Sequence, residues 1–76
     1  MKIVYLKWKD ATFYDRYVER DEKLDLLVIE ECGFLVYEDK EKVVFATSYE
    51  EKERRWKYVH AIPKVNIIKR RVIKLD

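Results

Sequence analysis

One glycine stands inside the longest apolar stretch of the chain, and this position restricts the possible folds more than any other. Residues 26–37 are apolar at odd and even positions alike, apart from the central interruption by Glu30 and Glu31. This pattern is typical of a strand whose two faces are both covered. A glycine inside a strand marks a bulge or a sharp bend, where a Cβ would not fit. We therefore predict one long strand over residues 25–38, bent at Gly33, as in a small sheet that curls into a barrel.

Alternation of apolar and polar residues predicts four further strands. Over residues 2–9, Val4, Leu6 and Trp8 fall on one face and polar residues on the other, which is the period of a half-buried strand. Similar patterns predict strands over residues 43–47, 56–62 and 68–75. We expect the bend to bring Trp8 and Trp56 into one dry interior.

The connections between these strands differ in length and composition. Residues 10–24 combine many charges with apolar side chains that follow no clear period, so we predict a long, partly packed loop with a short helical turn. Residues 39–42 form a polar hairpin turn, and residues 50–55 form a charged connection. Residues 63–67 form a short turn, because a proline cannot donate to a ladder and fits at a strand end.

These elements predict a mainly β fold, a small five-stranded SH3-like or Sm-like barrel with a long first loop and a short turn before the last strand. An OB-type barrel is the nearest alternative, but it normally needs more residues and more glycine than this chain contains. A length of 76 residues predicts a single small β-barrel domain, residues 1–76, with a thin core.

Several short motifs carry a resemblance that spans nearly the whole chain. They are Trp8-Lys9-Asp10, Glu31-Cys32-Gly33-Phe34-Leu35-Val36 with Glu38-Asp39, Val44-Phe45-Ala46-Thr47-Ser48, and Ala61-Ile62-Pro63-Lys64 with Ile67. In these motifs the chain resembles a group of short phage and prokaryotic proteins, mostly uncharacterised, for which an SH3-like or Sm-like β-barrel is expected. The Gly-Trp that often follows the first strand in that group is replaced by Arg16-Tyr17. The group has no agreed activity, so the resemblance supports the fold and transfers no catalytic or binding residue.

Charge is unevenly distributed along the chain, although the net charge is only +2. Residues 1–9 hold three lysines and no acidic residue, residues 10–41 hold eleven acidic and four basic residues, and residues 64–76 hold five basic residues and one acidic residue. A single cysteine excludes an internal disulfide and fits a reducing compartment. Charges interrupt every apolar run before it reaches signal-peptide or membrane length, so we expect a cytoplasmic protein without membrane contact.

Residues suited to catalysis or metal binding are few. A metal site needs three or four converging ligands, whereas the chain has one histidine, His60, and one cysteine, Cys32. These two are the residue types of a nucleophile and its base, but no orienting third group is apparent, and Glu30 and Glu31 disfavour a thiolate. We therefore expect no enzyme, no metal and no cofactor, with Cys32 packed at the bend as a small hydrophobic residue.

The strongest functional candidate is a basic patch on the first and last predicted strands, which are commonly neighbours in such barrels. It would consist of Lys7, Lys9, Lys64, Lys69, Arg70, Arg71 and Lys74. Tyr5 and Tyr58 are the candidate aromatic contacts, which would allow stacking of single-stranded nucleic acid or RNA. Alternatively, these charges pair with the acidic middle of the same chain or of a neighbouring copy.

We interpret the chain as a non-enzymatic protein-interaction module of unknown process. The last strand is rich in β-branched residues, and an open strand edge is a template for another chain. The partner is therefore a protein or a second copy, and the separated charges favour a homo-oligomer. The alternative hypothesis is nucleic-acid binding through the basic terminal strands.

Overall fold

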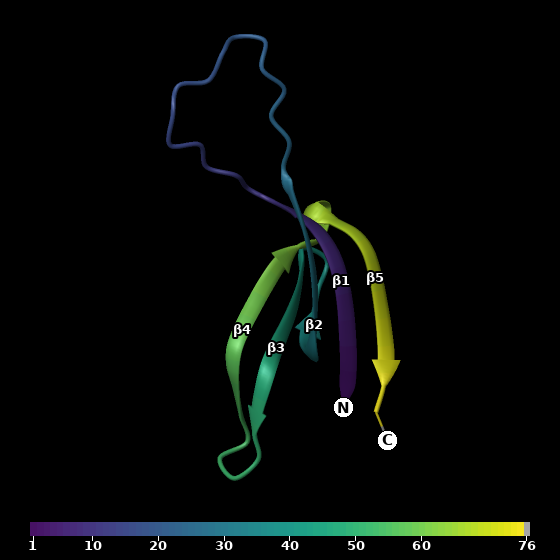
Figure 1. The fold of residues 1–76 in the computed structure, drawn as a ribbon. Helices are drawn as coiled ribbons and strands as arrows, with labels where there is room; N and C mark the ends of the chain where they lie inside the picture. The colour runs from purple at the N-terminus through teal and green to yellow at the C-terminus, as the bar shows by residue number, and fades with distance from the viewer. Residues whose placement is uncertain (76) are drawn as a thin grey trace.

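In a computed structural model, which describes residues 1–75, five antiparallel strands form one sheet (Figure 1). The elements are β1 (Lys2–Asp10), β2 (Leu27–Glu38), β3 (Lys42–Glu50), β4 (Arg55–Pro63), the 3-10 helix η1 (Lys64–Asn66) and β5 (Ile67–Lys74). The strand order is β4-β3-β2-β1-β5, so β4 and β5 are the edges. The five predicted strands are confirmed. The short helical turn predicted within residues 10–24 is absent, and the turn predicted over residues 63–67 contains η1.

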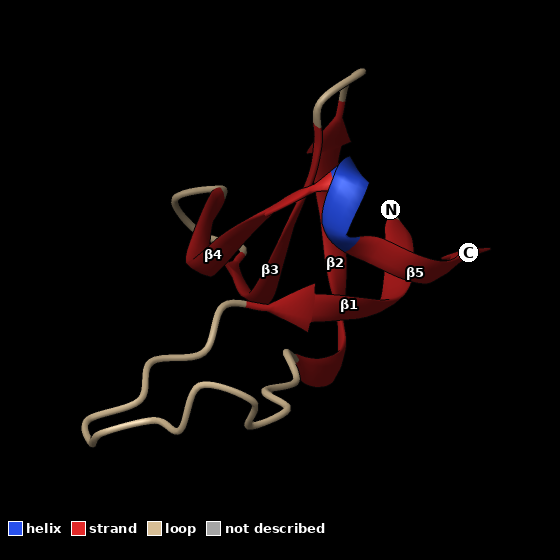
Figure 2. Ribbon diagram, turned by 90° about the horizontal axis from the view of Figure 1, so that it is seen from above, coloured by secondary structure: helices blue, strands red, loops and turns tan. Residues whose placement is uncertain are grey.

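The sheet is strongly twisted and curled, but it remains open. Figure 2 shows the strands crossing one another at large angles, with η1 linking β4 to β5. No ladder joins β4 to β5 within residues 1–75, so the mainly β class is established and closure into a barrel is not. No helix in this part of the chain has the length and apolar character needed to cross a membrane.

The central strand β2 changes partner along its length. Its first part, up to Phe34, pairs with β1, and the part that begins at Phe34 pairs with β3. A Cβ on Gly33 would lie 2.7 Å from the carbonyl oxygen of Ala46 and 2.7 Å from Cδ2 of Phe45. The predicted long strand and the absence of space at Gly33 are therefore confirmed. The register shift itself comes later, between Leu35 and Tyr37.

The buried core lies between β1 and the β3–β4 hairpin. Its members are Val4, Leu6, Val43, Phe45 and Ile62, with Trp8, Leu35 and Ile67 packed against them. The buried positions in β1 alternate as predicted. Strand β3 contributes the most, because four consecutive residues from Val43 to Ala46 are buried.

The prediction that both tryptophans share this interior is wrong. Trp8 packs against the core, whereas Trp56 packs in a tilted arrangement against Tyr49 and Phe34, at ring-centroid distances of 4.7 and 6.0 Å. The cause is the topology. Trp8 lies near the end of β1 that leads into the long loop, whereas Trp56 lies beside the β3–β4 turn at the other end of the sheet (Figure 1).

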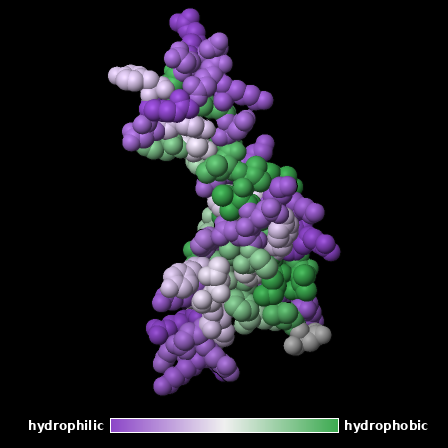
Figure 3. Space-filling model, in the orientation of Figure 1, coloured by the Kyte–Doolittle hydropathy of each residue, from purple (hydrophilic) through white to green (hydrophobic). Residues whose placement is uncertain are grey.

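The loop over residues 11–26 extends away from the sheet (Figure 1). The radius of gyration is 15.7 Å, against about 11 Å for a compact chain of this length. Phe13 and Tyr17 are 87% and 101% exposed, and the packing is limited to contacts such as the bond from Tyr14 Oη to the Asp25 carbonyl, at 3.3 Å. Figure 3 shows hydrophilic side chains over most of the loop and hydrophobic ones where it joins the sheet. The long loop is therefore confirmed.

Candidate functional site

Strand β1 divides its side chains between two environments. Val4 and Leu6 are fully buried, so the residues that alternate with them, Tyr5 and Lys7, point to the opposite face of the sheet. Lys9 follows the same alternation and is exposed. Lys7 and Lys9 therefore lie on a face that the core does not cover.

The edge strand β5 adds cations to the same face. Lys69 is directly opposite Lys7, and Arg71 is directly opposite Tyr5. Directly opposed residues on antiparallel strands share a face, and like charges in such a pair destabilise the sheet. We call Tyr5, Lys7, Lys9, Lys69 and Arg71 the basic face.

Strand β2 borders the basic face with one acidic residue. Glu30 is directly opposite Lys7, and its Oε1 accepts a hydrogen bond from the Tyr5 hydroxyl at 2.5 Å. This hydrogen bond, together with partial burial and the nearby negative charge, raises the pKa of Tyr5. The hydroxyl of the central aromatic residue is thus already engaged within the sheet.

Arg70 and Lys64 do not belong to the basic face, although we predicted both in the patch. Arg70 is opposite the buried Leu6 and therefore points to the other side of β5. There its guanidinium pairs with Glu38, and Lys64 Nζ lies 3.2 Å from the second oxygen of that carboxylate. Burial acts to raise the pKa of Glu38, but the hydrogen bond from Lys64 and the two positive charges outweigh it, so this pKa is lowered.

The two remaining members of the predicted site lie elsewhere. Lys74 is opposite Lys2 at the far end of the β1–β5 ladder, in register with the side of Leu6 rather than that of Lys7. Tyr58 lies on β4, which β2 and β3 separate from β1. Of the two candidate aromatic contacts, only Tyr5 accompanies the cations.

Cys32 and His60 lie on opposite faces of the sheet. The His60 ring lies 5.1 Å from that of Phe45, and its Nδ1 lies 3.1 Å from Oε2 of Glu31. Cys32 follows Glu31 in β2, is paired with Tyr5 and is exposed. The expectation of a buried Cys32 is therefore wrong, because the alternation at the bend turns it to solvent. Residues 1–75 contain no group of three or more side chains placed to bind a metal ion.

An aromatic group at the other edge was not anticipated from the sequence. Trp56 contacts Tyr49, its direct partner across the β3–β4 ladder, and also Phe34 of β2. Tyr58 follows two residues later with a φ of 58°, in the left-handed region that bulky residues rarely adopt. The sequence did contain a signal for this contact. Tyr49 and Trp56 flank a charged turn, and residues that flank a hairpin turn face each other.

Comparison with known proteins provides no relative for this chain. No protein-family model, no curated protein and no solved structure matches it. The function of the site therefore has to follow from its geometry and its charge.

Proposed function

We propose that the protein is a non-enzymatic protein-interaction module that binds an extended acidic segment along β5. The observation that carries this proposal is the direct opposition of Lys7 and Lys69, beside Arg71, on an exposed face next to a strand edge. Such an arrangement is unfavourable in the isolated sheet. A ligand that supplies carboxylates relieves the repulsion.

Three cations of this face form no ion pair in the described part of the chain, although Glu30 lies directly opposite Lys7. Within residues 1–75, the ion pairs at 4.0 Å or less leave out Lys7, Lys69 and Arg71. Strand β5 has a partner on one side only, so its other side offers backbone donors and acceptors to an added strand. An acidic strand would gain both main-chain hydrogen bonds and charge pairs.

Two features favour a protein segment over a nucleic acid at this face. Binding of single strands relies on aromatic rings that stack with bases, but Tyr5 is the single aromatic residue of the basic face, and Glu30 holds its hydroxyl. Ile3 and Ile73 are directly opposed on the same face, and they suit apolar side chains of a peptide that alternates with acidic ones.

The finer fold class forms part of the same proposal. We propose that the curled sheet is of the SH3-like or Sm-like barrel type, with β4 and β5 as the open seam. The long first loop, the close packing of Gly33 of β2 against β3 and the 3-10 helix before β5 support it.

The test uses a fluorescent peptide as long as β5, eight residues, in which glutamate and valine alternate. Fluorescence anisotropy should show binding of this peptide and not of the matching lysine–valine peptide. The double variant Lys69→Glu/Arg71→Glu should weaken binding at least about tenfold, since it reverses two charges on the face. Affinity should also fall as salt is raised through the physiological range.

A matched control makes the same change in net charge elsewhere. Lys40 and Lys52 are exposed in the turns on either side of β3, and Lys40→Glu/Lys52→Glu should bind the peptide within about twofold of the native protein. Equal losses in both double variants would mean that only net charge matters, and the proposal would be abandoned. Sedimentation of the protein alone tests whether a second copy supplies the segment, in which case Lys69→Glu/Arg71→Glu should abolish self-association.

A further inference from the structure

We infer that the β4 edge carries a second binding site, separate from the basic face, which takes unpaired bases of a single-stranded nucleic acid. The site is built from Trp56 and Tyr58 of β4, Tyr49 of β3 and the cations that flank them. It does not rest on the proposed function of β5, because β1, β2 and β3 lie between the two edges.

Three aromatic rings form a connected group here, and Tyr58 follows Trp56 two residues later on β4. The Trp56 ring lies 4.7 Å from Tyr49 and 6.0 Å from Phe34, measured between centroids. Trp56 is partly exposed, and it lines a cavity of about 460 Å³ together with Glu50, Arg55 and Lys57. This volume lies within the range of small-molecule sites, so the indole offers a stacking surface beside a space large enough for a base.

The backbone of Tyr58 is held in an unfavourable conformation. Its φ of 58° interrupts the β3–β4 ladder, which pairs Ala46 with Val59 and Ser48 with Lys57 but skips the position between them. For a non-glycine residue this conformation is unfavourable. Strain of this kind clusters at functional sites. The result is a tyrosine that is 61% exposed on an edge strand, with Lys57 Nζ 5.0 Å from its ring centroid.

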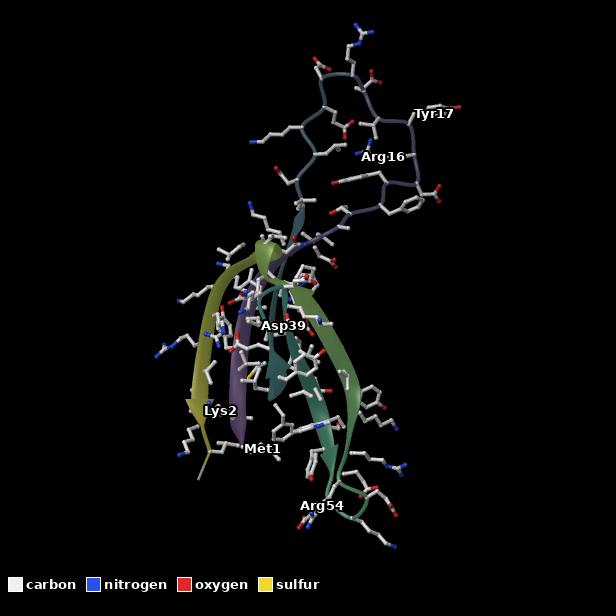
Figure 4. The ribbon with its side chains drawn as sticks, turned by 180° about the vertical axis from the view of Figure 1, so that it is seen from behind. Met1, Lys2, Arg16, Tyr17, Asp39 and Arg54 are labelled. Atoms are coloured by element: carbon white, nitrogen blue, oxygen red, sulfur yellow. The ribbon has the colours of Figure 1, made fainter. Side chains whose placement is uncertain are left out.

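The surrounding charges favour an anionic ligand weakly. Residues 50–57 contain four basic and three acidic residues. Glu50 is neutralised by Arg55, at 3.1 Å, and accepts the backbone N–H of Glu53. Lys57 and Arg54 take part in none of the ion pairs found within residues 1–75, and Figure 4 places Arg54 at the tip of the β3–β4 turn.

The combination of rings and cations selects the ligand class. A basic peptide would be repelled by Lys57 and Arg54, and an acidic peptide without aromatic residues would leave the rings unused. A duplex keeps its base faces stacked inside. A single strand presents both a flat base and a phosphate, which matches stacking residues beside one or two cations.

The test titrates the full chain with oligothymidylate of about 8 nucleotides, a length within the range of small single-strand binding domains. In a Trp8→Phe background Trp56 is the remaining indole, and its fluorescence should be quenched on binding. Tyr58→Ala should weaken binding about 5- to 150-fold, the loss that corresponds to one stacked base, whereas Tyr58→Phe should stay within about twofold because the ring is kept. Each substitution Arg54→Gln and Lys57→Gln should reduce the salt slope by about 0.7.

Controls separate this site from the basic face and from non-specific attraction. Tyr17→Ala removes a still more exposed tyrosine from the distant loop, and it should leave affinity unchanged (Figure 4). Lys69→Glu/Arg71→Glu should weaken binding of the acidic peptide but change oligothymidylate binding by less than about threefold. Unquenched Trp56 fluorescence at saturation, equal binding of a duplex of the same length, or full affinity in Tyr58→Ala would each overturn the inference. The quenching measurement does not depend on any substitution at Tyr58, so it decides the question even where Tyr58→Ala fails to fold.

Discussion

Strands β3 and β5 have similar lengths and both are rich in β-branched residues, yet they differ completely in burial. Four consecutive residues of β3 are buried, from Val43 to Ala46, whereas β5 has one half-buried residue, Ile67, and is exposed from Ile68 onward. Strand β3 has partners on both sides, and β5 has β1 alone. Apolar composition therefore does not decide which strand builds the core. Position in the sheet does.

This difference assigns separate roles to the two strands. The side chains of β3 hold the fold together through apolar burial, which stabilises by about 25 cal/mol per Å². Strand β5 is held by its ladder to β1 and by the Arg70–Glu38 ion pair. The other cations of β5, Lys69, Arg71 and Lys74, make no ion pair within residues 1–75. They are therefore available to bind a ligand.

Truncation of a large side chain in each strand gives the largest expected contrast. Phe45→Ala should lower the free energy of unfolding by about 3–5 kcal/mol, because a fully buried ring is lost and a cavity remains. That is most of the stability of a small domain. Val72→Ala, in an exposed position of β5, should cost less than about 0.5 kcal/mol. Urea titrations followed by circular dichroism measure both, and similar losses would show that β5 shares the core.

Gly33 lies where the sheet passes from its β1–β5 half to its β3–β4 half. Gly33→Ala should lower the free energy of unfolding by about 1–3 kcal/mol, because the added methyl group meets the backbone of Ala46 and the ring of Phe45 at 2.7 Å. Ser48→Ala, near the end of β3, is a control that adds no atoms. An unchanged melting temperature for Gly33→Ala would mean that β2 and β3 can move apart at this position without loss of stability.

Much of the sheet could be predicted from the sequence because its signals are local. The alternation of Val4 and Leu6 identifies the buried face of β1, and the single glycine within an apolar run identifies Gly33 as a position without space for a Cβ. Both follow from strand geometry and Cβ sterics. The boundaries of β3 were too short in the prediction, since Ser48 and Tyr49 carry no local strand signal as clear as that of Val43 to Phe45.

The candidate site was predictable only in part, because its arrangement depends on pairing between distant strands. The sequence shows Lys69, Arg70 and Arg71 as one basic run, but alternation along β5 sends Arg70 to Glu38 and leaves the other two on the opposite face. Likewise, the location of Tyr58 depends on the strand order, which places β4 and β5 at opposite edges. Alternation alone separates Arg70 from its two neighbours, but neither its pairing with Glu38 nor the strand order can be derived from spacing along the chain.

The edge strand β4 offers a test in which the usual ranking of two residues should reverse. In a regular strand, a variant with glycine is less stable than the variant with alanine at the same position, by about 0.5–1 kcal/mol. At position 58, however, the left-handed φ penalises alanine and not glycine. Tyr58→Gly should therefore be more stable than Tyr58→Ala by about 1 kcal/mol.

The matched pair for this comparison is Val59→Gly and Val59→Ala, one residue further along β4. There alanine should be the more stable substitution, since Val59 pairs with Ala46 in the regular ladder. Melting temperatures of the four variants suffice. The same ranking at both positions would indicate that Tyr58 adopts an ordinary extended conformation.

The turn between β2 and β3 gives the smallest expected effect, and it depends on pH. Asp39 accepts hydrogen bonds from Lys42 Nζ and from the backbone N–H groups of Glu41 and Lys42, and these lower its pKa to about 2. A carboxylate whose pKa is lower in the folded state than in the unfolded state contributes stability above the unfolded pKa, near 3.8, and loses it as the pH falls toward 2. Because Asp39 is exposed, the contribution is small.

Asp39→Asn should accordingly be slightly less stable than the native protein at pH 7, with the difference disappearing between about pH 4 and pH 2. Urea midpoints measured across this range test the window. The control is Asp15→Asn, in the exposed loop, for which the native and variant midpoints should coincide at every pH. If the urea midpoints of Asp39→Asn and the native protein still differ at pH 2, the turn is stabilised by its shape and hydrogen bonds rather than by the charge of Asp39. The turn that joins the two halves of the sheet would then be insensitive to acid.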